Sequence, residues 1–524
     1  YLPPQFASRV RGSTRWQADI GMNASGKSGL SVSSDLVGVA IDLPAPLAKT
    51  AEQAIALRIS KETGKESGTG ETDNILARYG DLFSLRAQLP KDAPARLHLR
   101  FGAGEVSAAT EAGLNISGAL RRLDLDAWRA LDLVGTTTGV ADKTGVAEKS
   151  GITAKLPLRE ASVVFNELQL FNRRFNDTHV RVRPAGGGWR VVIAGREVSG
   201  ELVTIPAGDK LSVLANFKRL SLPEALPDKT PAAMTRDDDS LADHLVSLEL
   251  SADSTQWQGR ELGELHLRIS PDTAAMARGG GLRMENFQLK SADGVLRGKG
   301  TLANHPRRPT RFEVELESDN LGKLLDQLGY PGRLKRGAGR ISGPLGWTGG
   351  VERFNLATLS GDLNLDLKQG QFTKVDPGAG KLLGMLSLQS LPRRIALDFG
   401  DVFSEGFAFD EISGNVHLER GSAYFKDLKM NGPAAKVRMS GVADLVHESQ
   451  NLRVTIQPRL EDTVALAGAL LGGPVVGVGT FIANKILQNP IGQAATFEYA
   501  ISGPWAEPVV TKLARPKAKN EGDG

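Results

Sequence analysis

The stretch GDLNLDLKQG, residues 361 to 370, places a leucine at every second position from 363 to 367, with polar or charged residues between. Successive side chains of an extended chain point to opposite faces, so these leucines share one face. A period of two therefore predicts a β-strand with one apolar and one polar face. The alternation recurs along the chain, for example in LHLRFG from residue 97, RFEVELES from 311 and NLRVTIQP from 451. At the usual spacing of strands there are roughly twenty-five such runs.

A second repeated feature is an aliphatic residue or methionine followed by Ser-Gly. It occurs seven times, with the glycines at 118, 200, 343, 361, 414, 441 and 503. Glycine tolerates positive φ, and serine can bond to nearby backbone, so the phrase suits a strand end or a bulge. We expect it to mark bends between successive antiparallel strands.

Helical patterns are few: residues 126–134, 319–330 and 376–391. Three polar or glycine-rich stretches predict loops or linkers, at 61–74, 136–151 and 223–244. So few helices cannot cover the apolar faces of about twenty-five strands. Two arrangements follow: sheets packed face to face in sandwiches, or one sheet that curls and leaves an apolar groove, about 120 Å long at about 4.8 Å per strand. The alternation alone favours neither.

Charge and chemistry exclude several functions. The 64 Lys and Arg nearly balance the 60 Asp and Glu, and a net charge of +4 on 524 residues does not predict nucleic-acid binding. There is no cysteine, and the seven histidines are scattered singly, without metal-ligand spacing. The sequence DPGAGKLLG lacks the first glycine and the hydroxyl of a phosphate-binding loop. We predict no catalytic residue, metal or cofactor, and therefore no enzyme.

Residues 464–483 form a run of twenty residues without a charge. That length could span a membrane, but Gly472-Gly473-Pro474 interrupts it, and such a break favours two short apolar helices in a hairpin. Three alternatives stay open: a hairpin that contacts a membrane, a buried plug on the sheet, and a true span. Under the first, the membrane contacts are Leu470, Leu471, Val475, Val476, Phe481 and Ile482.

The sequence from Leu391 to Leu445 resembles the C-terminal region of the YhdP branch of the AsmA-like proteins. So do VDPGAGKLLGMLSLQSL before it, PRLEDTVALAGALLGGPVVG after it and the closing YAISGPWAEPVV. Upstream, SDLVGVAIDLPAPLAK and LNISGALRRLDLDAW carry a looser similarity. The branch has an N-terminal inner-membrane helix that is not in this sequence, so we expect this chain to be the C-terminal portion.

The resemblance implies a periplasmic bridge in a Gram-negative envelope, along which phospholipid moves between the inner and outer membranes. It favours the groove over the sandwich, and it brings no catalytic residues. The fold class expected is therefore mainly β: a long, curled, mostly antiparallel sheet forming an elongated hydrophobic groove, with a few short helices and a C-terminal apolar helical hairpin. The expected partners are phospholipid, the outer membrane through the hairpin and the inner membrane through an anchor outside this sequence. The residues expected to line the groove are Val314, Leu316, Leu363, Leu365, Leu367, Val454 and Ile456.

The predicted organisation has eight segments. They are groove strands at 1–135, a loop at 136–151, groove strands at 152–222, a flexible linker at 223–244, the AsmA-like region at 245–460, the hairpin at 461–490, a closing strand at 491–515 and a disordered tail at 516–524. Two further functions remain as alternatives. An envelope scaffold would bind an outer-membrane assembly partner without carrying lipid, and a polysaccharide-active enzyme would need clustered acids on one strand face.

Overall fold

The computed structural model describes residues 8–22, 28–66, 70–131, 156–208, 210–224, 226, 245–272, 282–303, 308–350, 354–373, 407–433, 435–458, 496–505 and 507–513. The chain divides into two compact units. Unit 1 holds residues 1–235 and 248–259, and unit 2 holds residues 236–247 and 260–524. Each unit is described by itself below.

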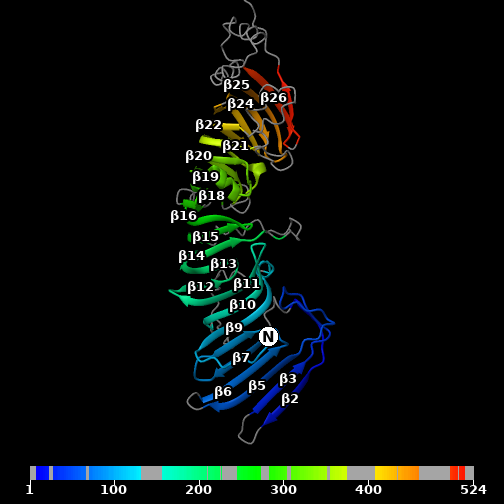
Figure 1. Ribbon diagram of the computed structural model, residues 1–524. Helices are drawn as coiled ribbons and strands as arrows, with labels where there is room; N and C mark the ends of the chain where they lie inside the picture. Colours follow the sequence, from blue (N-terminus) through cyan, green and yellow to red (C-terminus); the bar gives the residue numbers. More distant parts are fainter. Residues whose placement is uncertain are drawn as a thin grey trace, which may run out of the picture. The chain divides into compact units, whose positions relative to one another are not determined.

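Unit 1 is built almost entirely of strands. A small two-stranded sheet pairs β1 (Val10–Gly12) with β4 (Val39–Ile41). The main sheet contains β2 (Gln17–Met22), β3 (Ser28–Ser34), β5 (Leu57–Glu66), β6 (Gly70–Tyr79), β7 (Phe83–Pro90), β8 (Arg96–Phe101), β9 (Gly113–Asp124), β10 (Leu158–Leu170), β11 (Arg173–Ala185), β12 (Gly188–Ala194), β13 (Val198–Ala207), β14 (Lys210–Leu222) and β15 (Leu245–Trp257, in this unit from Leu248). From β2 to β14 each strand of the main sheet pairs with the next in the sequence, and they lie side by side in that order (Figure 1).

Unit 2 repeats this plan. Its strands are β16 (Arg260–Pro271), β17 (Leu282–Lys290), β18 (Gly294–Leu302), β19 (Pro309–Ser318), β20 (Leu334–Thr348), β21 (Ser360–Phe372), β22 (Phe407–Glu419), β23 (Ser422–Asn431), β24 (Ala435–Asp444), β25 (Ser449–Pro458), β26 (Phe497–Pro504) and β27 (Val509–Lys512). All are antiparallel to their sequence neighbours. The expectation of a mainly β, mostly antiparallel protein is confirmed. The predicted closing segment holds two strands, β26 and β27.

One strand departs from the antiparallel plan. β9 runs parallel to both β8 and β10. A parallel neighbour needs a connection that returns to the starting end of the sheet. The segment between β8 and β9 makes such a crossover, and it buries Val106 and Ala109 against the sheet. No motif in the sequence distinguished this strand from the others.

The repeated Ser-Gly steps lie within strands and not between them, which corrects the expectation of inter-strand bends. Gly343 lies in the middle of β20 and Gly441 within β24, with φ of +148° and +128°. A Cβ added at either glycine would lie 1.9 Å from the Asp362 carbonyl oxygen or 2.3 Å from that of Asn451, so the neighbouring strand approaches too closely for any side chain. Several steps coincide with shifts of register, as at Ser199-Gly200 and after Ser413. They therefore act as in-strand kinks and bulges, the other use of glycine in sheets.

Two α-helices lie in the described parts of the chain. Helix α5 (Leu321–Gln327) begins after Asn320, whose side chain accepts a hydrogen bond from the Lys323 backbone at 3.1 Å, as the sequence predicted for 319–330. Helix α2 (Leu125–Arg129) is shorter than the predicted 126–134 over the residues described. A single 3-10 turn, η2, covers Leu356–Thr358. The predicted helix at 376–391 lies outside the described residues.

The predicted loop at 61–74 is wrong. Residues 61–66 continue β5 and residues 70–74 begin β6, and the two strands pair from Leu57↔Tyr79 to Glu66↔Gly70. The stretch is rich in charge and glycine, which local composition associates with loops. Ladder hydrogen bonds to both flanking strands override that preference. The loop at 136–151, the hairpin at 461–490, the tail at 516–524 and nearly all of the 223–244 linker lie outside the described residues.

Candidate functional site

The most extensive feature of unit 2 is the apolar face of its sheet, defined here as the face that carries Leu363, Leu365 and Leu367. The seven residues predicted to line a groove all lie on this face. Leu316 is opposite Ile341, which is opposite Leu365. A register row then runs from Leu367 through Ile412, Met430 and Val437 to Ile456, across five strands. The two remaining predicted residues, Val314 and Val454, fall at matching positions of β19 and β25.

Side chains on this face are more deeply buried in β22 to β26 than in β21. Between residues 361 and 368 half-buried and exposed residues alternate strictly, with the leucines half-buried. Val454 and Ile456 are buried in a cluster with fourteen other buried residues, among them Phe409 and Leu452, and with eight partly buried neighbours. Helix α5 contributes Leu321 and Leu324 to this cluster, so strands and helix together exclude water from this part of the face. The sequence predicted the shared face but not this gradient.

A hollow accompanies a different row of unit 2. Met284, Gly300, Phe312, Leu345 and Gly361 face one another in sequence across β17 to β21, and two of the five are glycines. These five and eleven other residues of the same strands, among them Arg283, Lys299, Arg311 and Glu313 of the opposite face, line a hollow of about 810 Å³. The hollow therefore does not belong to the apolar face alone.

Unit 1 has an equivalent apolar face, defined here by the row Val32–Ile59–Ala77–Leu85–Leu99 across β3 to β8. This face is accessible to solvent in the first strands, where Leu30 and Ile59 are 41% and 38% exposed. Apart from β1 with β4, the described residues contain no other sheet that could cover it. Large aliphatic side chains of this face therefore remain exposed to solvent.

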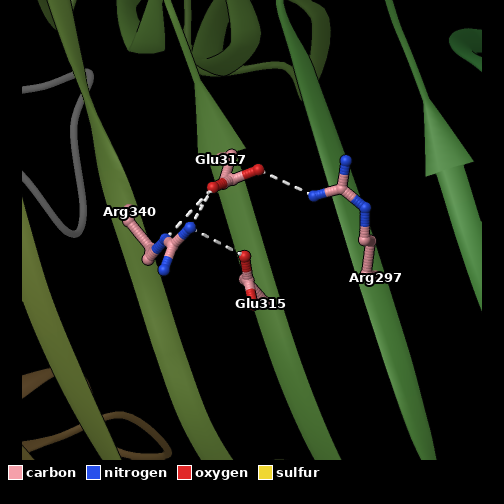
Figure 2. A network of polar contacts seen from close by, with 4 residues as sticks. All are labelled: Arg297, Glu315, Glu317 and Arg340. Carbon is pink, nitrogen blue, oxygen red and sulfur yellow. Dashed lines mark hydrogen bonds and ion pairs between the residues drawn. The ribbon is translucent and has the colours of Figure 1, made fainter.

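The opposite face of unit 2 is a charged surface. Figure 2 shows Glu317 of β19 between Arg340 of β20 and Arg297 of β18. Arg297 donates to Glu317 at 2.7 Å, while Arg340 binds Glu317 and, at 3.2 Å, Glu315. Hydrogen bonds from Arg340 and then Arg297 lower the pKa of Glu317, which therefore stays ionised. Such cross-strand ladders keep the polar face solvated and fix the register.

Five charged or hydroxyl side chains interrupt the apolar face of unit 1 at one end of its strands. Lys61 Nζ lies 2.8 Å from Asp73 Oδ2, and the Thr63 hydroxyl donates to Asp73 Oδ1 at 2.5 Å. In the next row outward, Lys91 pairs with Glu71. The hydrogen bonds from Lys61 and Thr63 lower the pKa of Asp73, and the hydrogen bond that Lys91 donates to Glu71 raises the pKa of Lys91. We call these five residues the rim cluster. Sequence analysis missed it because four of the five lie in the stretch predicted as a loop.

The described ranges contain no group of three or more histidine or acidic side chains that could hold a metal ion. Within the same ranges, no helix is long and apolar enough to cross a membrane. The six residues predicted to contact a membrane, from Leu470 to Ile482, lie outside the described parts, so that prediction stays untested.

The fold and its faces define a class: a mostly antiparallel β-protein whose strands present one apolar and one polar face. A family model described as YhdP protein matches residues 1–510, so the chain belongs to the YhdP family. It is 24% identical over 541 residues to the protein of Escherichia coli (strain K12) named intermembrane phospholipid transporter YhdP, a match that covers 99% of this chain. The chain spans about 40% of the length of that relative. No solved structure matches it.

Proposed function

We propose that this chain carries phospholipid between two membranes by holding the acyl chains against the apolar faces of its sheet. The observation that carries the proposal is the open apolar face of unit 1, where Leu30 and Ile59 remain exposed beside the apolar row from Val32 to Leu99. Exposed contiguous apolar surface on a folded protein usually marks a binding surface. The name of the Escherichia coli relative, an intermembrane phospholipid transporter, supports phospholipid as the ligand.

The energetic reason for such a face is the cost of exposing lipid tails to water. A phospholipid has about thirty tail methylenes, and at about 0.8 kcal/mol each their exposure costs about 24 kcal/mol. A protein surface that stays apolar from strand to strand removes that cost along the path. The charged opposite face, with ladders such as Arg297–Glu317, keeps the protein itself in water.

The proposal extends to location and to the ends of the path. We place the chain in the periplasm of a Gram-negative bacterium, with phospholipid as the transported ligand. Val314, Leu316, Leu363, Leu365, Leu367, Val454 and Ile456 line the path in unit 2. Contact with the outer membrane through residues 464–487, and an inner-membrane anchor outside this sequence, belong to the same proposal.

The experiment is a matched pair of substitutions on opposite faces of unit 1. Leu30→Asp places a carboxylate on the apolar face, and Leu76→Asp places one on the polar face, where Leu76 is 46% exposed and lies opposite Ser60 and Arg86. Both side chains keep two-fifths or more of their surface in solvent, so either substitution should cost only about 1–2 kcal/mol and leave the protein folded. An acyl chain that passes an unpaired carboxylate must desolvate it, at a cost of several kcal/mol, roughly 3 or more.

The measurement is the amount of phospholipid extracted from each protein after incubation with liposomes and repurification, with circular dichroism as the check of folding. Wild type and Leu76→Asp should carry equal amounts of lipid. Leu30→Asp should carry at least tenfold less, because the desolvation cost exceeds the roughly 1.4 kcal/mol that corresponds to a factor of ten. Equal loading of all three folded proteins would contradict the proposal, as would a wild type without lipid above background.

A further inference from the structure

The rim cluster is unexpected because of the row in which it lies. Lys61 is opposite Leu30 on one side and Ile75 on the other, and Ile75 is followed by Ala87 and Leu97. Every other member of this row is apolar. Asp73 is directly opposite Thr63 and, on the other side, Leu89. A lysine and an aspartate thus stand on the face that, by the proposed function, contacts lipid.

Stability does not account for this placement. The Lys61 and Asp73 side chains are 45% and 33% exposed. Ion pairs with that degree of exposure contribute about 0–1 kcal/mol, and an aliphatic pair would suit the row at least as well. Inward-pointing lysines also protect edge strands from aggregation, but β5 pairs with strands on both sides. Binding of a ligand is therefore the better explanation for the placement of Lys61 and Asp73 on this face.

We propose that the rim cluster binds the headgroup of a zwitterionic phospholipid whose amine carries N–H donors, with phosphatidylethanolamine as the type. This inference rests on the proposed function, because the acyl chains would lie on the apolar face beside it. Binding at the rim cluster would make the proposed lipid transport selective among phospholipid headgroups.

The chemistry of the cluster matches both charges of such a headgroup. The ammonium of Lys61 donates to a phosphate, and Asp73 and Glu71 accept from the headgroup amine. Charge-assisted hydrogen bonds of this kind are stronger than neutral ones. Because Asp73 is held ionised by Lys61 and Thr63, the acceptor is already charged before lipid arrives.

The two acceptors of the cluster give the direction of the preference. An anionic headgroup such as phosphatidylglycerol brings a phosphate without an amine, so it cannot make a charge-assisted N–H contact with Asp73 or Glu71. Phosphatidylcholine brings a quaternary amine, which has no N–H to donate to Asp73 or Glu71. Both should bind less well than phosphatidylethanolamine.

The test is competition among headgroups on the full 524-residue chain. Protein is incubated with liposomes that contain equal amounts of phosphatidylethanolamine, phosphatidylcholine and phosphatidylglycerol, then repurified, and its lipid is identified by mass spectrometry. The test variant Lys61→Met/Asp73→Leu makes the row fully apolar. A milder variant, Asp73→Asn, removes only the negative charge and retains an acceptor for Thr63.

A matched control removes an ion pair from the other face of the same unit. Arg190 and Glu201 lie 2.9 Å apart with side chains 49% and 41% exposed, close to the values at Lys61 and Asp73. They share a face with Val192 and Val203, opposite the face of Val191 and Leu202. Arg190→Met/Glu201→Leu therefore reproduces the loss of an exposed pair without touching the lipid-facing surface.

Wild type and the Arg190/Glu201 control should carry phosphatidylethanolamine in about fivefold excess over either competitor, the ratio that 1 kcal/mol of headgroup contact produces. In both rim-cluster variants the excess should fall to about the liposome ratio, while total lipid per protein is unchanged. An excess that survives in both variants, or a wild type that carries the three lipids equally, overturns the headgroup site alone. A wild type that carries no lipid overturns the proposed function and this inference with it.

Discussion

Leu452 provides the sharpest test of the burial gradient along the apolar face of unit 2. Its side chain is 2% exposed, between Gly441 of β24 and Ile501 of β26. Leu452→Ala removes three carbon groups, worth about 2.4 kcal/mol of transfer free energy. Gly441 has no side chain to fill the space, so a cavity term is added and the total should reach about 3–4 kcal/mol.

The comparison is Leu30→Ala, a leucine-to-alanine substitution on the exposed apolar face of unit 1. Leu30 keeps 41% of its surface in solvent, so Leu30→Ala should cost only about 1.4 kcal/mol, without a cavity term. Amide hydrogen exchange read by mass spectrometry gives the local opening free energy of each region separately.

Protection of β24 to β26 in Leu452→Ala should fall by about 150- to 900-fold, and protection of β3 in Leu30→Ala by about tenfold. The two proteins serve as controls for each other, because each leaves the other region unchanged. A loss in β24 to β26 no greater than the loss in β3 would refute the closed, self-buried arrangement of the C-terminal strands.

Two further predictions concern the charged face and the apolar run near the C-terminus. The pKa of Glu317 lies below its usual 4.5, so the stability that Glu317 contributes is present above that pH and is lost as the pH falls through the lowered value. In urea unfolding, Glu317→Gln should be less stable than wild type at pH 7, and the difference should shrink as the pH falls below 4.5. A difference that does not change with pH would contradict the ladder. If residues 464–487 contact a membrane, Leu471→Glu/Val475→Glu should weaken liposome flotation by orders of magnitude with an unchanged circular dichroism spectrum. A wild type that does not float, together with a lower melting temperature of the variant, would support the buried plug in its place.

The sequence by itself determined which residues become strands and which side chains share a face. Alternation with a period of two is a local property, and pairing in the sheet preserves it, so Leu363, Leu365 and Leu367 fall where the pattern predicts. The helix at Leu321–Gln327 is also local in origin, because its apolar spacing and its Asn320 cap both lie within one segment.

The tertiary structure decided what local pattern does not encode. Residues 61–74 carry the composition of a loop, yet ladder bonds to the flanking strands hold them in β5 and β6 and bring Lys61 to Asp73. The parallel setting of β9 likewise depends on the path of a crossover. Above all, the same alternation leaves Leu30 open and buries Leu452, because exposure depends on what packs over the face, and Leu452 lies in a cluster drawn from α5 and from strands between β20 and β26. Such packing involves many elements together, so no single stretch of sequence states it.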